Sequence, residues 1–191
     1  MNKPNNSRGS GTIRIIGGIH KGRKLPVLDS EGLRPTTDRV KETLFNWLMF
    51  SVRNAKCLDL FAGSGSLGFE ALSRQAESVT MIEKEKKVFQ NLQKCADILK
   101  ENNLKLINGD ALSFLKNTTD SYNIVFLDPP FRKDFLNEIF NLLTPSIVPN
   151  NAFVYVEQEA ENITEAPKSF KLIKEGKAGQ VIYRLYQLDW T

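Results

Sequence analysis

The stretch that decides the fold covers residues 57–70 and reads CLDLFAGSGSLGFE. It opens with a short apolar run ending at Asp59, passes through a glycine-rich turn at Gly63 and Gly65, and continues as the start of an apolar helix. A strand, a glycine-rich loop and a helix together present backbone N–H groups to a nucleotide-like ligand. The spacing G-x-G-x-x-G, completed by Gly68, suits NAD, FAD and S-adenosylmethionine (SAM) alike.

The carboxylate of Asp59 discriminates among these ligands. It lies at the end of the predicted strand, shortly before the first glycine. An unpaired carboxylate there would repel the pyrophosphate of a dinucleotide, whereas it would attract the ammonium and sulfonium groups of SAM. Asp59 could instead only cap the loop by accepting backbone N–H bonds. The pattern favours SAM as the ligand.

Length and composition indicate one globular domain. The 191 residues are 41% hydrophobic and 25% charged, which is ordinary for a folded domain. We expect this domain to cover residues 12–191, after a flexible leader over residues 1–11. No apolar run could span a bilayer, and the N-terminus lacks the apolar core of a secretory signal, so we expect a cytoplasmic protein.

The cysteines and the histidine argue against a metal site. Cys57 and Cys95 are far apart, lack metal-ligand spacing and lie in apolar segments. They are therefore interpreted as buried, reduced thiols. His20 is the single histidine of the chain, which disfavours a histidine-based metal centre or a catalytic triad. We expect no metal.

Positive charge is concentrated at the N-terminus. Residues 1–41 hold nine basic and three acidic side chains, so their net charge is +6. The whole chain has a net charge of +4, so the remaining residues carry −2. A basic arm on a mildly acidic body suggests a polyanionic partner, most simply nucleic acid, although a solvated leader has the same composition. A short strand within residues 12–19 and a second short strand after Lys21 are predicted to form a basic hairpin within residues 12–33 that contacts phosphates. The candidate contact residues are Arg14, Lys21, Arg23, Lys24, Arg34 and Arg39.

The remaining chain alternates strands and helices. A capped helix is predicted from about Asp38, with Trp47 as one of its core side chains rather than a base-stacking ring. Strands are predicted at residues 78–83, 104–108, 123–127 and 151–158, followed by an antiparallel pair at residues 170–174 and 181–188. This order predicts an α/β fold with a mostly parallel sheet and helices on both faces.

Two further acids follow predicted strands. Glu83 ends the second strand of the sheet, where nucleoside-binding folds place an acid that accepts both ribose hydroxyls. Its alternative role is a charge at the N-terminus of the next helix. Asp110 follows the third strand, and it could accept a hydrogen bond from an adenine amino group, cap a helix, or do both.

The second specific motif is Asp128-Pro129-Pro130-Phe131, directly after an apolar strand. The prolines fix the backbone at the carboxyl end of that strand, where α/β folds bind their ligands. Asp128 and the Pro129 carbonyl could accept both N–H bonds of a planar exocyclic amine and turn its lone pair toward an electrophile. Phe131 could stack on the base. An ordinary Pro-Pro turn with a buried Phe is the alternative.

Taken in order, these motifs resemble class I SAM-dependent methyltransferases that act on an exocyclic amine. The segments RIIGG at residues 14–18, KGR at 21–23 and RPTTDRVKE at 34–42 narrow the resemblance to the bacterial RsmD family. That family methylates guanine N2 in 16S ribosomal RNA. The resemblance extends from residue 12 to the last strand.

The resemblance implies a Rossmann-like class I methyltransferase fold: a mostly parallel seven-stranded sheet with an antiparallel closing strand and a small basic N-terminal hairpin. It implies 16S rRNA or a small-subunit assembly intermediate as partner. We expect a monomer, although the sequence leaves the oligomeric state open. The implied SAM-binding residues are Asp59, Phe61, Ala62, Gly63, Ser64, Gly65, Glu83, Asp110 and Ala111. The implied catalytic residues are Asp128, Pro129, Pro130 and Phe131.

Three other functions fit parts of the pattern. A DNA amino-methyltransferase can share the Asp-Pro-Pro-aromatic motif, but no extra sequence for target recognition is evident. An NAD-linked oxidoreductase would have to explain Asp59 and the paired prolines. The third alternative is a catalytically silent RNA-binding protein, which would account for the basic arm without any methyl transfer.

Overall fold

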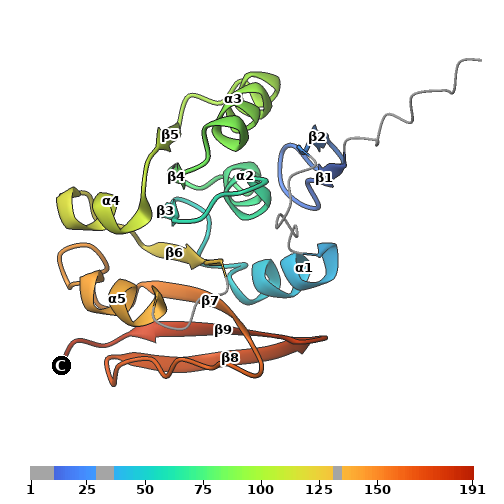
Figure 1. Cartoon of the computed structure of the whole chain (residues 1–191). Helices are drawn as coiled ribbons and strands as arrows, with labels where there is room; N and C mark the ends of the chain where they lie inside the picture. The colour runs from blue at the N-terminus through green and yellow to red at the C-terminus, as the bar shows by residue number, and fades with distance from the viewer. Residues whose placement is uncertain (1–10, 29–36, 131–134) are drawn as a thin grey trace, which may run out of the picture.

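The computed structural model describes residues 11–28, 37–130 and 135–191 (Figure 1). The elements in chain order are β1 (Thr12–Arg14), β2 (Lys24–Pro26), α1 (Asp38–Trp47), β3 (Lys56–Asp59), α2 (Ser66–Ser73), β4 (Ser78–Glu83), α3 (Lys86–Leu99), β5 (Leu104–Asn108), α4 (Ala111–Asn117), β6 (Ile124–Leu127), α5 (Phe135–Leu142), β7 (Phe153–Glu159), β8 (Phe170–Ala178) and β9 (Val181–Leu188).

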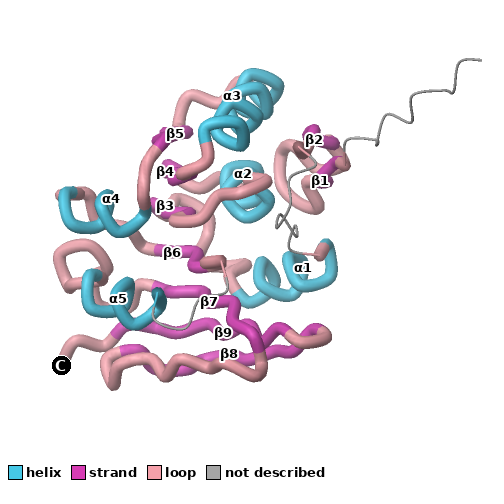
Figure 2. Tube along the Cα trace, in the orientation of Figure 1, coloured by secondary structure: helices cyan, strands magenta, loops and turns pink. Residues whose placement is uncertain are grey.

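Seven of these strands form one sheet in the order β5-β4-β3-β6-β7-β9-β8. The pairs from β5 through β7 are parallel, whereas β9 runs antiparallel to both β7 and β8. Helices α1, α2 and α3 cover one face of the sheet, and α4 and α5 cover the other (Figures 1 and 2). The predicted α/β fold with an antiparallel closing pair is confirmed.

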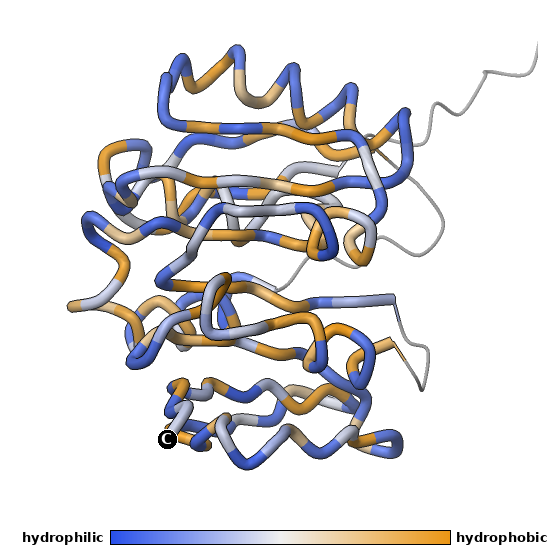
Figure 3. The backbone as a smooth tube through the Cα atoms, turned by 90° about the vertical axis from the view of Figure 1, so that its left-hand side faces the viewer, coloured by the Kyte–Doolittle hydropathy of each residue, from blue (hydrophilic) through white to orange (hydrophobic). Residues whose placement is uncertain are grey.

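Apolar alternation along the strands supplies a core on each face. On β6, Phe126 belongs to the core under α1 to α3, whereas its neighbours Val125 and Leu127 belong to the core under α4 and α5. Figure 3 shows the strands largely in the hydrophobic colours and the outer turns of the uppermost helix in blue. Trp47 stacks on Tyr183 with ring centroids 5.5 Å apart, consistent with the packing role predicted for it.

The N-terminal hairpin is shorter than the sequence suggests. A strand was expected over residues 12–19, but β1 ends at Arg14. Beyond it, the backbone N–H groups of Ile16 and Ile19 donate to Glu70 and to the Ser73 carbonyl of α2 instead of to a neighbouring strand. These tertiary contacts therefore end the hairpin ladder early.

The antiparallel pair β8–β9 differs from the prediction in the opposite way, because β8 is longer than expected. Strand β8 was expected to end near residue 174, with Gly176 in the connection, but it continues to Ala178. An irregularity between Leu172 and Lys174 shifts the register, after which Gly176 pairs with Tyr183. A β-bulge of this kind lets a strand bend and resume pairing. Of the two glycines between the predicted strands, Gly179, with φ of 60°, takes the turn conformation, whereas Gly176 is part of β8.

Candidate functional site

Three acidic side chains gather at the carboxyl edge of the parallel sheet. Asp59 and Glu83 end the neighbouring strands β3 and β4, and Asp128 directly follows β6 on the other side of β3. In the β3–β6 register Asp59 pairs with Phe126, two residues before Asp128. The two motifs that the sequence singled out therefore lie at adjacent strand ends, where open α/β sheets bind ligands.

Asp59 is buried, with 3% of its surface exposed. Its Oδ2 accepts a hydrogen bond from the Gly68 N–H of α2 at 3.1 Å. Burial raises the pKa of Asp59 to about 7, with a smaller contribution from Glu83, while hydrogen bonds from the Gly68 and Phe61 backbones oppose the rise. The carboxylate thus caps the loop, and a nearby cation would be needed to hold it fully ionised at neutral pH.

The glycine-rich loop is tied to the next strand by Glu83. One carboxylate oxygen of Glu83 accepts from the Gly63 N–H at 2.9 Å, and the other accepts from the Glu85 N–H at 2.7 Å. Gly65 caps α2 with φ of 79°, and a Cβ there would lie 2.3 Å from the Phe69 ring. Only glycine fits this position, so loop, strand end and helix start form one fixed unit.

Asp110 caps helix α4, as the helix-capping alternative predicted. Its Oδ1 accepts from the backbone N–H groups of Leu112 and Ser113, each at 3.1 Å, and Oδ2 lies 3.1 Å from the Lys84 ammonium. These bonds, the one from Ser113 first, lower the pKa of Asp110. The next residue, Ala111, is buried at 5% exposure. Both residues lie beyond the end of β5, one strand away from Glu83.

Asp128 stands in surroundings that disfavour its charge. Burial raises the pKa of Asp128 well above its usual range, and the neighbouring carboxylates of Glu157 and Asp59 raise it further. Pro129 is buried and Pro130 is exposed. Phe131, the aromatic member of the motif, lies outside the described residues. A carboxylate in such surroundings accepts hydrogen bonds strongly, because little water competes for it.

Sequence reasoning missed two residues beside Asp128. The pairing of Leu127 with Val156 sets Asp128 next to Glu157 in the adjacent strand β7. Glu157 is buried at 8% exposure, and the Tyr155 hydroxyl donates to its Oε1 at 2.8 Å. A signal was present in the sequence, since Glu157 is a charged residue that follows an apolar strand run, as Asp59 and Asp128 do.

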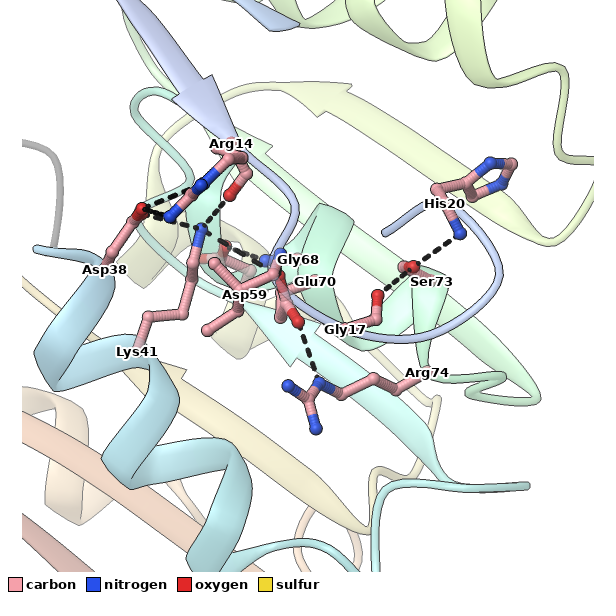
Figure 4. Close-up of polar contacts among 11 residues, drawn as sticks. Arg14, Gly17, His20, Asp38, Lys41, Asp59, Gly68, Glu70, Ser73 and Arg74 are labelled. Carbon is pink, nitrogen blue, oxygen red and sulfur yellow. Dashed lines mark hydrogen bonds and ion pairs between the residues drawn. The ribbon is translucent and has the colours of Figure 1, made fainter. Parts of the chain in front are cut away.

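The N-terminal arm, defined here as residues 11–28, is fastened to the second half of α2 (Figure 4). The Ile16 N–H donates to Glu70 Oε2 at 2.9 Å. The Ser73 hydroxyl donates to the Gly17 carbonyl at 2.6 Å and accepts from the His20 N–H at 3.0 Å. Helix α2 therefore meets the glycine-rich loop at its first turn and the arm at its last.

A buried charge cluster reinforces this attachment. Lys41 of α1 is 1% exposed, and its ammonium donates to the Arg14 carbonyl at 2.6 Å while lying 3.9 Å from Glu70. Glu70 also accepts from Arg74 Nε at 2.8 Å. Burial lowers the pKa of Lys41, and the carboxylates of Glu70 and Asp38 counteract it. Figure 4 shows Glu70 linked to both cations.

A family model described as "Conserved hypothetical protein 95" matches residues 13–187. The chain belongs to this family. The resemblance to RsmD-type proteins that the motifs indicated is thereby confirmed.

Named relatives agree with this family. "Ribosomal RNA small subunit methyltransferase D" of Escherichia coli (strain K12) is 54% identical over 191 residues, covering 99% of this chain and 96% of that protein. The protein of the same name from Haemophilus influenzae is 48% identical, covering 98% of this chain and 100% of its own. Among solved structures, the "Putative methyltransferase yhhF" from Escherichia coli superimposes with a TM-score of 0.88 at 50% identity, covering 95% of this chain and 100% of that one.

The basic residues predicted to contact nucleic acid differ in whether their side chains already have a protein partner. Arg14 pairs with Asp38 at 3.0 Å, and Arg23 donates to the Ile98 carbonyl near the end of α3 at 3.0 Å. Both guanidinium groups thus already have protein partners. The other described candidates are exposed: Lys21, Lys24 and Arg39. Arg34 lies outside the described residues.

Within residues 11–28, 37–130 and 135–191, no group of three or more His, Cys, Asp or Glu side chains could hold a metal ion. Cys57 and Cys95 are both buried free thiols. No helix in this described part has the length and apolarity needed to cross a bilayer.

Proposed function

We propose that this protein transfers a methyl group from SAM to the exocyclic N2 amine of a guanine in the 16S rRNA of the small ribosomal subunit. The observation that carries the proposal is the juxtaposition of the Asp59–glycine loop after β3 with Asp128-Pro129 after the adjacent β6. One motif suits a cationic nucleoside, and the other suits a planar amine. The relatives named small-subunit rRNA methyltransferase D support the same substrate.

The residues present fit SAM. Asp59 offers a buried carboxylate whose ionisation a cation would favour, and Gly63 and Gly65 shape the loop beside it. Glu83 would accept the ribose hydroxyls, and Phe61, Ala62 and Ser64 would complete the loop. Asp110 and Ala111, one strand further along, would lie against the adenine. When bound, SAM supplies an electrophilic methyl group on a sulfonium.

Asp128 would act on the amine rather than on the methyl donor. The lone pair of an exocyclic amine is delocalised into the base, so the nitrogen is a weak nucleophile. Hydrogen bonds from the two amine protons to Asp128 and to the Pro129 carbonyl would orient that lone pair, and Pro130 and Phe131 would complete the pocket for the base. Positioning and hydrogen bonding of this kind account for most of the rate enhancement we propose.

The test uses SAM with a labelled methyl group and three substrates: naked 16S rRNA, a small-subunit assembly intermediate and the whole small subunit. Mass mapping should locate one N2-methylguanine. Asp128→Asn should reduce the rate on the order of 10²–10³-fold while SAM binding persists. Transfer only to DNA, or no transfer to any ribosomal substrate, would refute the proposal.

We further propose that residues 12–191 work as one methyltransferase domain, that the protein is a monomer, and that it acts in the cytoplasm. The continuous sheet from β5 to β8 supports a single domain. Sedimentation of the purified protein, alone and with RNA, would test the oligomeric state directly.

A further inference from the structure

Helix α3 lies directly beside the N-terminal arm (Figure 1). Asn91 Nδ2 donates to the Pro26 carbonyl at 2.8 Å, and the Cys95 thiol contacts the same oxygen at 3.4 Å. Near the other end of the helix, Arg23 donates to the Ile98 carbonyl at 3.0 Å. Strand β2 therefore lies along the side of α3 that contains Asn91 and runs in the opposite direction to the helix.

Two exposed lysines lie on this side of α3. Lys87 and Lys94 are exposed, and together with Asn91 they recur at the spacing of residues on one helix face. At a rise of 1.5 Å per residue, the two lysines start about 10 Å apart along the helix axis. The exposed acid Asp97 follows Lys94 by three residues, so it flanks the C-terminal end of this stripe.

The stripe points toward the candidate site. Helix α3 begins at Lys86, three residues after Glu83 at the carboxyl edge of the sheet. Lys87 is therefore near the site, and Lys94 lies about two turns further away, beside β2. Lys24 in β2 is also exposed. Lys24, Lys94 and Lys87, here called the α3 strip, thus lead from the arm to the edge where Glu83 and the glycine-rich loop meet.

The cations of the α3 strip are also available for a partner. Some exposed lysines elsewhere pair with acids, as Lys56 does with Glu77 at 3.8 Å and Lys105 with Asp120 at 3.5 Å. In the described part of the chain, no acidic side chain forms an ion pair with any lysine of the α3 strip. The arm's arginines, by contrast, already have protein partners.

We propose that the α3 strip binds the sugar–phosphate backbone of the substrate RNA and guides it from the arm to the methyl-transfer site. The proposal rests on the proposed function, because it takes RNA as the partner. Lysine is suited to this role, since its ammonium is a point charge on a flexible stem and contacts phosphates without reading sequence. The RNA-binding surface therefore extends beyond the N-terminal hairpin onto a helix of the central domain.

The test reverses charge in Lys87→Glu/Lys94→Glu and compares it with Lys171→Glu/Lys174→Glu. The control pair is also exposed, but it lies on β8 at the opposite end of the sheet from α3. Binding is measured over a range of salt concentrations, on naked 16S rRNA or the small subunit, whichever the wild type methylates. SAM binding by calorimetry checks that each variant is folded.

We expect the α3 variant to bind RNA about tenfold more weakly at 0.1 M salt, with the slope of log affinity against log salt reduced by about 1.5. Its KM for RNA should rise with little change in kcat, and the control should match the wild type. Equal losses of RNA affinity in both variants would show that only the net charge of the protein matters, and would refute the proposed role of the α3 strip. Unchanged binding in the α3 variant would overturn the strip while leaving the proposed function intact. A wild type that neither binds nor methylates ribosomal RNA would instead refute the function itself.

Discussion

The two ends of helix α2 do different work with different chemistry. At its first turn the contacts are made by backbone N–H groups, such as that of Gly68 donating to Asp59 nine residues earlier. At its last turn they are made by the side chains of Glu70 and Ser73, which bind a segment more than 50 residues away in sequence. The comparison teaches that the ligand end is built from local sequence, whereas the arm end depends on long-range packing.

The same comparison predicts how each end fails. A change at the arm end should affect stability and RNA binding, because the side chains there are buried and charged. A change at the ligand end should affect SAM binding, because the carboxylates there are held by backbone that substitution leaves in place. Four substitutions or titrations test this division.

The largest effect is expected from Glu70→Gln at the arm end. It leaves the buried ammonium of Lys41 without the carboxylate 3.9 Å away, and only Asp38, at 3.8 Å, remains. Removing one partner of a buried ion pair costs about 3–5 kcal/mol. Denaturant unfolding of the ligand-free protein at pH 7 measures the loss.

Glu77→Gln is the matched control for that substitution. Glu77 also pairs with a lysine, Lys56, at 3.8 Å, but both side chains are more than half exposed. Exposed pairs contribute about 0–1 kcal/mol, so this variant should unfold close to the wild type. If the two variants lost equal stability, the charge cluster around Glu70 would not be what fastens the arm.

The next effect is expected from Gly18→Ala in the arm. Gly18 has φ of 75°, and a Cβ there would lie 1.9 Å from the Ser73 carbonyl oxygen. Gly22→Ala is the control, since Gly22 has φ of 87° with nothing within 4 Å of the added carbon. The control should lose about 1–2 kcal/mol from backbone strain alone. Gly18→Ala should lose more, and its RNA affinity should fall while SAM affinity persists.

A smaller effect is expected at the ligand end, from the titration of Asp59. Its pKa of about 7 in the fold is above the value for an exposed carboxyl. In the ligand-free protein, this carboxyl contributes stability that is present at acid pH and lost as pH rises toward 7. Binding of cationic SAM favours the ionised form, so affinity should weaken as pH falls below 7, by up to about tenfold per pH unit.

Calorimetry of SAM binding between pH 8 and pH 6 measures this dependence. Asp59→Asn should bind SAM more weakly at pH 8, and most of the change with pH should disappear. The pKa of Asp128, at the same edge of the sheet, is also raised, so the variant is needed to assign the titration to Asp59. Affinity that is independent of pH in the wild type would contradict a SAM-facing role for the Asp59 carboxylate.

This division also explains which features the sequence could predict. The strand ends at Asp59 and Asp128 follow from apolar runs that precede a glycine-rich loop and a pair of prolines, and the strand end at Glu83 follows from an apolar run that precedes a charged helix. Parallel strands bring these ends to one edge of the sheet. Nothing local in the sequence indicates that Glu70 accepts from Ile16, or that Lys41 is buried. Such pairings depend on how separate elements pack.

Two other differences have the same origin. The strand expected over residues 12–19 ends early because α2 supplies partners for its backbone. Glu157 was missed as a neighbour of Asp128, because strand order within the sheet, β6 beside β7, is needed to place them together. Alternation along one strand predicts which face a side chain occupies, but it does not identify the neighbour across the strand pair.

The smallest effect is expected from Asp38→Asn, which tests the charge of the arm rather than its attachment. The Arg14–Asp38 pair is 3.0 Å long, with side chains 57% and 47% exposed. A phosphate that binds Arg14 must displace Asp38, and an exposed pair of this kind is worth about 0.2–1 kcal/mol. Releasing Arg14 should therefore raise RNA affinity about two- to fivefold at low salt, measured by the same salt titration.

Arg14→Ala supplies the opposite change and should lower RNA affinity. Lys41 holds the Arg14 carbonyl rather than its guanidinium, so the arm keeps this attachment in both variants. Stability should change little in Arg14→Ala, whereas Asp38→Asn should also lose some stability because Asp38 lies 3.8 Å from the buried Lys41 ammonium. If neither variant altered RNA binding at any salt concentration, the Arg14 guanidinium would serve only to join the arm to α1, and the RNA contacts of the arm would come from its exposed lysines.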